Sequence, residues 1–256
     1  MYYIHERVMK GEFMAGTWCN LGSSMAAEII GLAGYDWVLL DMEHTPSTTA
    51  GLLTQMQGLG RFPAAPIVRV PWLDQVYIKW ALDIGASGIM VPYVETAEQA
   101  AYAVSCMCYG PRGIRGLGAG TRASDYGYDF PEYFTRANQE LLTIVQVETG
   151  RTVENAAEIA AVDGADVLFV GPMDLGSNMN MPGRFNDPEF MKVLQRVADA
   201  ARGKGKACGI LLPGVELVHM FRDMGYTFIA VSSDSNILTR YFKENLKAMK
   251  GQASPR

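Results

Sequence analysis

The chain has 256 residues and a mass of 28.0 kDa, enough for one large domain or two small ones. Its 49% hydrophobic and 19% charged residues exclude intrinsic disorder. With a net charge of −5 it has no basic surplus for a nucleic-acid partner. The sequence shows no membrane-spanning run and no secretory signal, so we expect no membrane association. Four dispersed cysteines are typical of free thiols in a reducing cytoplasm.

Short apolar runs alternate with helical patterns along the whole chain. Such runs are typical of parallel strands that are covered on both faces. Eight of them occur, over 13–18, 37–43, 66–71, 88–94, 142–148, 166–172, 207–212 and 228–233. The helical patterns cover 23–33, 48–60, 73–85, 96–108, 150–162, 187–203, 214–224 and 235–250.

This alternation predicts a single-domain (β/α)8 TIM barrel of the α/β class, which typically needs about 250 residues. A doubly wound open sheet is the alternative, but no glycine-rich dinucleotide turn follows the first run. The connection at 109–139 is too long for a simple loop, and its aromatic residues predict an ordered lid. Its Arg112, Arg115 and Arg122 indicate either an anion-binding lid or a solvated basic loop.

The active site of such a barrel lies at the carboxyl ends of its strands, so polar residues there are the candidates. The second run ends with Asp41, Glu43 and His44, and the third contains Arg69. A guanidinium at this position can clamp a carboxylate or an enolate oxygen. The alternatives are helix capping or salt bridges for the acids and a structural ion pair for Arg69.

The fifth and sixth runs end with further polar side chains. Gln146 and Glu148 end the fifth run, and Asp174 follows the sixth. Two carboxylates with waters and a bidentate substrate suit a hard cation such as Mg²⁺, Mn²⁺ or Co²⁺. A metal-free acid and base pair is an alternative for Glu148 and Asp174, and a helix cap is a third possibility for Asp174.

Together these residues describe chemistry on a 2-oxo acid. The cation would chelate the keto and carboxylate oxygens, Arg69 would hold the keto oxygen, and His44 would move protons at an aldol hydroxyl. This predicts carbon–carbon bond cleavage or formation through a metal-bound pyruvate enolate. A lysine Schiff base is disfavoured, because no lysine lies in any of the eight runs.

The motifs DMEH, PIVRVPW, YGPRGIRG, VQVETG and FVGPMDLG, in this order, resemble the HpcH/HpaI aldolase family of metal-dependent pyruvate aldolases. The resemblance implies that Glu148 and Asp174 bind the metal, that His44 is the base, and that Arg69 stabilises the enolate. It assigns Asp83 to raising the basicity of the histidine, and it gives a supporting role to Asp41. It also implies substrate contacts from a set that includes Gln146, Met173, Asp174 and Trp18.

The same resemblance implies a homohexamer and the substrates of the reaction, a 4-hydroxy-2-oxo acid or pyruvate plus an aldehyde. Two departures from the family pattern, Gly176 where a serine is frequent and Met173 where an alanine is frequent, bear on the exact substrate. Oxaloacetate decarboxylation, with or without a further bond-forming step, is the first alternative. A CoA-ester lyase, which would use Arg112, Arg115 and Arg122, and a barrel without catalysis are the others.

Overall fold

The computed structural model describes residues 2–181 and 185–251, and eight parallel strands in it form a closed barrel. The order around the barrel follows the sequence, with β8 pairing back to β1. The strands are β1 Met14–Cys19, β2 Trp37–Asp41, β3 Ala65–Arg69, β4 Gly88–Val91, β5 Leu142–Val147, β6 Val167–Val170, β7 Ala207–Leu212 and β8 Phe228–Ser233. The predicted TIM barrel is therefore confirmed, and each predicted run contains its strand to within about one residue.

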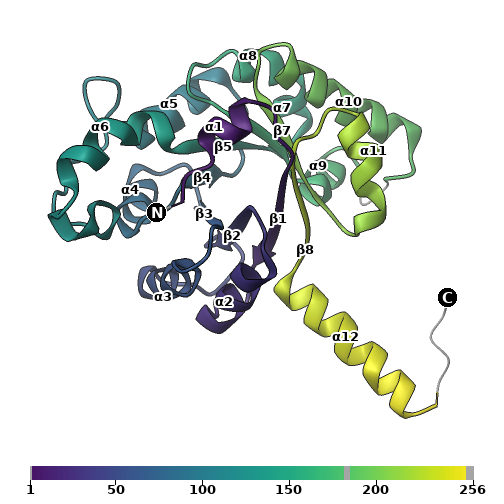
Figure 1. Cartoon of the computed structure of the whole chain (residues 1–256). Coiled ribbons are helices and arrows are strands. Elements are labelled where there is room, and N and C mark those ends of the chain that lie inside the picture. The colour runs from purple at the N-terminus through teal and green to yellow at the C-terminus, as the bar shows by residue number, and fades with distance from the viewer. Residues whose placement is uncertain (1, 182–184, 252–256) are drawn as a thin grey trace.

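Helices surround the barrel in Figure 1, and most begin and end close to the predicted positions. The α-helices are α1 His5–Met9, α2 Ser24–Ala33, α3 Thr49–Leu59, α4 Gln75–Ile84, α5 Ala97–Met107, α6 Phe130–Glu140, α7 Gly150–Glu154, α8 Ala156–Ala160, α9 Pro172–Asn178, α10 Pro188–Arg202, α11 Val218–Asp223 and α12 Asp234–Met249. Two short 3-10 helices, η1 Arg122–Gly127 and η2 Val215–Leu217, complete the set in the described residues.

Three differences from the predicted helices have local causes. The expected helix over 150–162 is divided into α7 and α8 at Asn155, whose side-chain Nδ2 donates 2.7 Å to the Glu95 carbonyl. The segment 109–139 is not one irregular loop, since it contains η1 and all of α6 except its last residue, Glu140. The sequence patterns did not single out α1 or α9, because helices of five and seven residues are too short to show periodicity.

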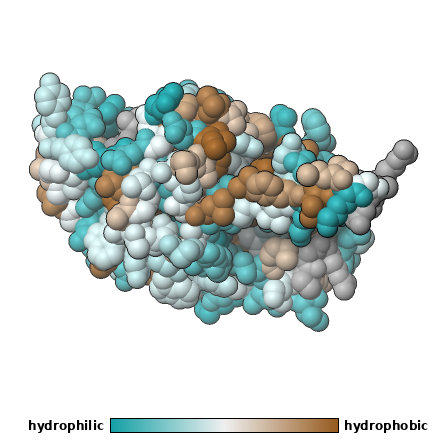
Figure 2. All heavy atoms as spheres, turned by 90° about the horizontal axis from the view of Figure 1, so that it is seen from below, coloured by the Kyte–Doolittle hydropathy of each residue, from teal (hydrophilic) through white to brown (hydrophobic). Residues whose placement is uncertain are grey.

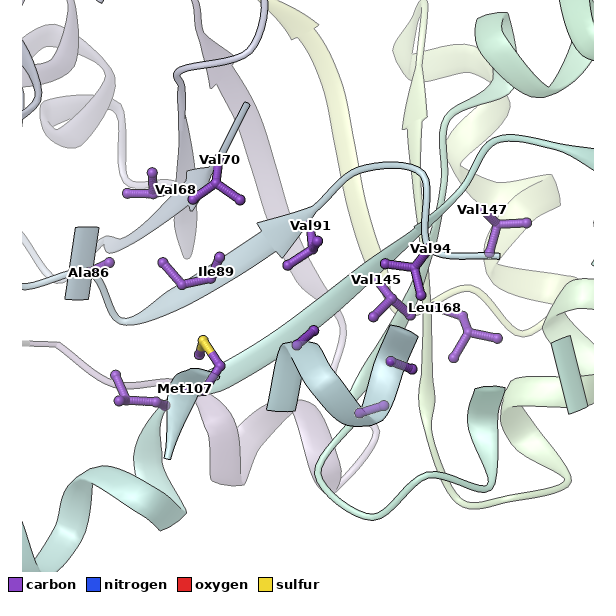
Figure 3. Close-up of a cluster of buried hydrophobic side chains, with 14 of the residues drawn as sticks. Val68, Val70, Ala86, Ile89, Val91, Val94, Met107, Val145, Val147 and Leu168 are labelled. Atoms are coloured by element: carbon purple, nitrogen blue, oxygen red, sulfur yellow. The ribbon is translucent and has the colours of Figure 1, made fainter. Parts of the chain in front are cut away.

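Two hydrophobic cores follow from the alternation of side chains along the strands. The inner core fills the barrel with Trp18, Trp37, Phe169, Phe228 and smaller side chains. Gly16 makes room for it, because a Cβ at this position would lie 2.1 Å from the Trp37 ring. The outer core lies between the strands and the helices, and Figure 3 shows part of it, with Val68, Ile89, Val91 and Val145 on β3 to β5 and Met107 on α5.

The helix α12 is not packed on the barrel along its length. Figure 1 shows it extending away from the other elements, and Asp234 in its first turn is its one buried residue. No helix in the described ranges has the length and apolar character needed to cross a membrane. The four cysteines are buried and free.

Candidate active site

The alternation that fills the barrel also sets which polar side chains reach its mouth. Trp37 and Leu39 point into the barrel, so Asp41, two residues further, faces the same way at the carboxyl end of β2. Arg69 follows Ile67 on β3 in the same manner and lies opposite Asp41 in the strand register. The sequence therefore places both charges on one face of neighbouring strands.

Arg69 is held by two carboxylates. Its Nε and Nη2 donate to the two oxygens of Asp41 at 2.9 and 2.7 Å, and its Nη1 lies 2.8 Å from Glu43 Oε2. The guanidinium is buried and its carbon lies 5.9 Å from the Trp18 ring centroid. A guanidinium has five N–H donors, and two of them bond Asp41, so three remain for Glu43 and for a ligand in the cavity that Arg69 lines. Arg69 can therefore form the ion pair with the two acids and still bind an oxygen of a substrate.

His44 stands at the rim of the same pocket. Asp41 Oδ1 accepts the backbone N–H groups of Glu43 at 3.0 Å and His44 at 3.5 Å, which fixes the turn after β2. The imidazole itself is 66% exposed, and its Nε2 lies 3.7 Å from Glu43 Oε2. Burial is the main cause that raises the pKa of Glu43, against the opposing effect of Arg69.

Glu148 is a carboxylate with little solvent around it. It is 1% exposed, directly after β5, and its Oε2 accepts the backbone N–H of Tyr93 at 3.1 Å. Desolvation raises its pKa to about 7, the Tyr93 N–H opposes this, and the nearby charges of Glu43 and Asp174 add to it. Gly171 is required beside it, because a Cβ there would lie 2.8 Å from Glu148 Oε1.

Asp174 reaches the pocket from the first turn of α9, directly after β6. Its neighbour Met173 is 61% exposed and also lines the pocket. At this position a carboxylate interacts favourably with the helix dipole, so the predicted helix-end function and a ligand function can coexist.

These side chains share one cavity of about 410 Å³. Gln146 is 2% exposed, and its Oε1 has no hydrogen-bond partner within the described chain. Trp18 and Phe169 form an apolar part of the wall, with ring centroids 5.5 Å apart. Of the predicted site residues, the cavity brings together Trp18, Asp41, His44, Arg69, Gln146, Glu148, Met173 and Asp174.

Asp83 is not brought to this cavity within one chain. It lies near the end of α4, which runs back from the mouth of the barrel to the amino ends of the strands. There it accepts a hydrogen bond of 3.0 Å from Nη2 of Arg115, a buried guanidinium that is stacked 4.4 Å from the Tyr109 ring centroid. Sequence spacing alone also gave no reason to place Asp83 beside His44.

The segment 109–139 lies at the same end of the barrel as Asp83. Arg122 Nη1 donates 2.7 Å to the carbonyl of Ile84, the last residue of α4, and α6 ends directly before β5 begins. Arg112 pairs with Asp163 at 3.1 Å. The three arginines are thus engaged separately and do not line the cavity of their own chain, which gives no support to a nucleotide groove.

The structure also shows site residues that the sequence did not predict, and two of them act through the backbone. Tyr93, whose N–H holds Glu148, follows β4 with a φ of 50°, and Gly171 is needed for close packing. The rule that polar strand ends form the site could have singled out Tyr93 in MVPY, but a backbone donor has no side-chain signature. Asn20, directly after β1, and Ser232 on β8 also line the cavity.

The described residues contain no group of three or more His, Cys, Asp or Glu side chains arranged to hold a metal ion by themselves. Glu148 and Asp174 both line this cavity and could supply two oxygen ligands to a cation. The electrostatic influence of Asp174 and Glu43 on Glu148 means that a cation between these acids would relieve repulsion. The donor set therefore fits a hard divalent cation.

A closed parallel barrel with an acidic pocket at the carboxyl ends of its strands defines the class of (β/α)8-barrel enzymes. The chain belongs to the HpcH/HpaI aldolase/citrate lyase family, whose model matches residues 14–240.

Relatives and solved structures of the same family cover nearly the whole chain. It is 43% identical to the hydroxypyruvate/pyruvate aldolase of Delftia acidovorans, over 93% of this chain and 88% of that protein. It is 37% identical to the 4-hydroxy-2-oxo-heptane-1,7-dioate aldolase of Shigella sonnei, over 90% and 88% of the two chains. The crystal structure of a family protein from Burkholderia cenocepacia has a TM-score of 0.92 and 35% identity, over 96% and 98% of the chains.

Proposed function

We propose that the chain is a divalent-metal-dependent aldolase that cleaves and forms 4-hydroxy-2-oxo acids, with pyruvate and an aldehyde as the other side of the equilibrium. The relatives are named aldolases, which are carbon–carbon lyases acting on small molecules. The observation that carries the proposal is one cavity that combines a carboxylate pair, a guanidinium with free donors and an exposed imidazole. Each of these groups has a distinct function in the reaction.

Glu148 and Asp174 would hold the cation, for which we propose Mg²⁺, Mn²⁺ or Co²⁺. When bound, such an ion would orient the 2-oxo acid and withdraw electron density from its keto group. Glu148 directly follows β5, and Asp174 lies on α9 directly after the neighbouring strand β6, so the barrel brings the two carboxylates to one cavity before any ligand binds.

Arg69 and His44 perform the remaining chemistry. Negative charge develops on the keto oxygen as the bond between C3 and C4 breaks, and the N–H groups of Arg69 that do not bond Asp41 would stabilise it. The imidazole of His44 would take the proton of the C4 hydroxyl during cleavage and return it during addition. Trp18 and Phe169 keep this half of the cavity apolar, which strengthens both interactions.

Exchange of the methyl protons of pyruvate in D₂O tests this function without any aldehyde. We expect NMR to show exchange that is at least about tenfold faster with Mg²⁺, Mn²⁺ or Co²⁺ than in chelated protein, because the donor half of the reaction needs only pyruvate. Folded, metal-loaded protein that exchanges no protons with any of the three ions would overturn the proposal.

We also propose that the chain forms a homo-oligomer, and the predicted hexamer is one such assembly. The helix α12 presents Leu238, Tyr241, Phe242 and Leu246 to solvent, each at least 43% exposed. Figure 2 shows a hydrophobic band on the face from which α12 extends. A second exposed apolar stripe lies on α2, at Met25, Ile29 and Leu32. Packing of α12 from one copy against α2 of another would bury both stripes.

The location of Asp83 fits the same assembly. If Asp83 acts on His44, as the family resemblance implies, a second copy must supply it, because α4 holds it at the far end of its own barrel. The proposed arrangement therefore combines His44 of one subunit with the partner's Asp83. It also gives the segment 109–139 a place beside a neighbouring pocket, where it could serve as the predicted lid.

Complementation between two inactive variants tests the shared site. His44→Ala and Asp83→Asn are each expected to lose at least about 10²-fold in turnover. Co-expressed mixtures are expected to recover activity, because a subunit with an intact His44 can meet a partner with an intact Asp83. Asparagine keeps a hydrogen bond to Arg115, so the fold is retained. Sedimentation gives the subunit number, and mixed oligomers that stay inactive would contradict the shared site.

A further inference from the structure

The motif YGPRGIRG, which the proposed reaction does not use, contains a buried arginine. Arg115 is 3% exposed and its side chain has no exposed surface, although it lies in the long connection that follows α5. An arginine in such a connection normally reaches solvent, because removing a guanidinium from water is costly unless its partners compensate for the lost hydration. The contacts of Arg115 should therefore explain why the charge is kept there.

The backbone before Arg115 is fixed against two helices. The N–H of Ile114 donates 2.8 Å to the Ser105 carbonyl on α5, and Gln75 Nε2 at the start of α4 donates 2.9 Å to the Ile114 carbonyl. Gly113 is required in this turn, because a Cβ there would lie 2.3 Å from the Ser105 carbonyl oxygen. The chain therefore leaves Arg115 little freedom to move relative to α4.

The guanidinium of Arg115 lies between two aromatic rings and meets one carboxylate. Its carbon is 4.4 Å from the ring centroid of Tyr109 and 5.5 Å from that of Tyr133, and such contacts are strongest when they are buried. Tyr109 is itself fixed by Asn138 on α6, which accepts its N–H at 2.8 Å and donates to its carbonyl at 3.1 Å. Among the described residues the carboxylate that pairs with Arg115 is Asp83, whose Oδ1 accepts 3.0 Å from Nη2.

Asp83 is covered on one side only. Arg115 holds its Oδ1, no hydrogen bond to its Oδ2 occurs within the described chain, and 23% of the side chain is exposed. It lines a surface groove together with Trp80 and Tyr126, which are 45% and 70% exposed. Exposed aromatic side chains around a carboxylate are typical of a surface that another subunit covers. One oxygen of Asp83 is therefore held from behind, and the other is available to such a subunit.

Fold stability alone gives no sufficient reason for this ion pair. Replacement of a buried ion pair by apolar side chains of similar volume is often neutral or stabilising. A methionine at position 115 could fill the space between Tyr109 and Tyr133 without the cost of burying a charge. One hydrogen bond to a partly exposed carboxylate compensates poorly for a fully buried guanidinium. A charge kept under these conditions is expected where the orientation of its partner matters for function.

We propose that Arg115 is a positioning residue that holds Oδ1 of Asp83 and so directs Oδ2 to the partner's His44. This inference rests on the proposed aldolase function and its shared site, and it assigns to Arg115 the orientation of Asp83 instead of the binding of an anion. A carboxylate held in this way stabilises the imidazolium that forms when the partner's His44 takes the proton of the C4 hydroxyl. Arg115 itself does not contact the substrate.

A double-mutant cycle on kcat for aldol cleavage tests this function in the whole oligomer. Arg115→Met is expected to lower kcat about tenfold and to leave KM and the affinity for Mn²⁺ within about twofold of wild type, because it changes no substrate or metal contact. Asp83→Asn should lower kcat at least about 10²-fold. The double variant should equal Asp83→Asn, since Arg115 acts only through that carboxylate. Arg112→Met is the matched control from the same motif, because Arg112 pairs with Asp163 at the surface, and it should keep kcat.

Arg115→Lys keeps a charged donor for Asp83 and should lose only about threefold in kcat, so the cycle can be run with it if Arg115→Met does not fold. All rates are measured below the melting temperatures of the variants. A double variant that shows the product of the two single losses would reveal a merely structural contribution and overturn the proposal. Unchanged kcat in folded Arg115→Met, or equal losses in the lysine and methionine variants, would also overturn it.

The same measurements separate this inference from the function on which it rests. Full activity in Asp83→Asn would contradict the shared site, and absent proton exchange at the pyruvate methyl in metal-loaded wild type would contradict the aldolase itself. Exchange in wild type and a large loss in Asp83→Asn, together with an additive cycle, would contradict the positioning function of Arg115 alone.

Discussion

Replacement of Arg69 by lysine is expected to lower kcat for aldol cleavage by about 10²–10³-fold. The guanidinium holds Asp41 through two parallel hydrogen bonds and forms an ion pair with Glu43, and the N–H groups that do not bond Asp41 remain for the keto oxygen. An ammonium group has one nitrogen and three donors, so it cannot hold two carboxylates and the substrate oxygen in this geometry. Steady-state kinetics on a 4-hydroxy-2-oxo acid measure the loss.

The effect on the transition state must be separated from an effect on folding. Arg69 is buried between acids, so weakening its contacts also lowers the melting temperature. Pyruvate proton exchange, measured well below that temperature, should fall together with kcat. Arg61→Lys is the matched control, because Arg61 pairs with Glu28 at 3.1 Å on the surface and should keep full activity. Turnover like that of wild type in Arg69→Lys would remove Arg69 from the proposed function.

Most of the pocket could be predicted because its residues follow a local rule. Asp41 and Arg69 lie two positions beyond inward-facing core residues, and the alternation of a strand is visible in the sequence. Parallel strands that follow one another in sequence bring their carboxyl ends to the same rim. The barrel, Glu148 and Asp174 were accessible in the same way, from apolar runs and the residues that end them.

The remaining features depend on tertiary packing that a single sequence does not show. The position of Asp83 near the end of a predicted helix places it away from the strand ends, as observed, but nothing in KWALDIGA indicates which side chains it contacts there. The sequence pattern of α12 is that of an ordinary packed amphipathic helix. Nothing in its residues shows that the helix extends away from the barrel. Ser232 occupies its position because of a register shift between β8 and β1, which is a property of the closed sheet.

Glu148 is expected to be essential for activity and unfavourable for stability, so Glu148→Gln should abolish metal-dependent turnover while raising the melting temperature of chelated protein. The carboxylate is 1% exposed and the pKa is raised to about 7, mainly by desolvation. The folded state therefore disfavours the charged form that the unfolded chain adopts freely. Glutamine keeps an oxygen for the Tyr93 N–H and carries no charge.

The stability difference between Glu148→Gln and wild type should increase as the pH rises. A glutamate with a raised folded-state pKa destabilises the native state above its unfolded pKa of about 4.5, and the cost becomes complete above about 7. The glutamine variant should therefore match wild type near pH 4.5 and exceed it by about 3 kcal/mol at pH 8, or roughly 6–12 °C in melting temperature. Glu154→Gln, at an exposed position on α7, should show no such trend.

Equal melting temperatures for Glu148→Gln and wild type at pH 8 would show that the carboxylate is stabilised by its surroundings. A buried acid kept at such a cost is consistent with a ligand site, because a bound cation would offset the desolvation penalty of the carboxylate.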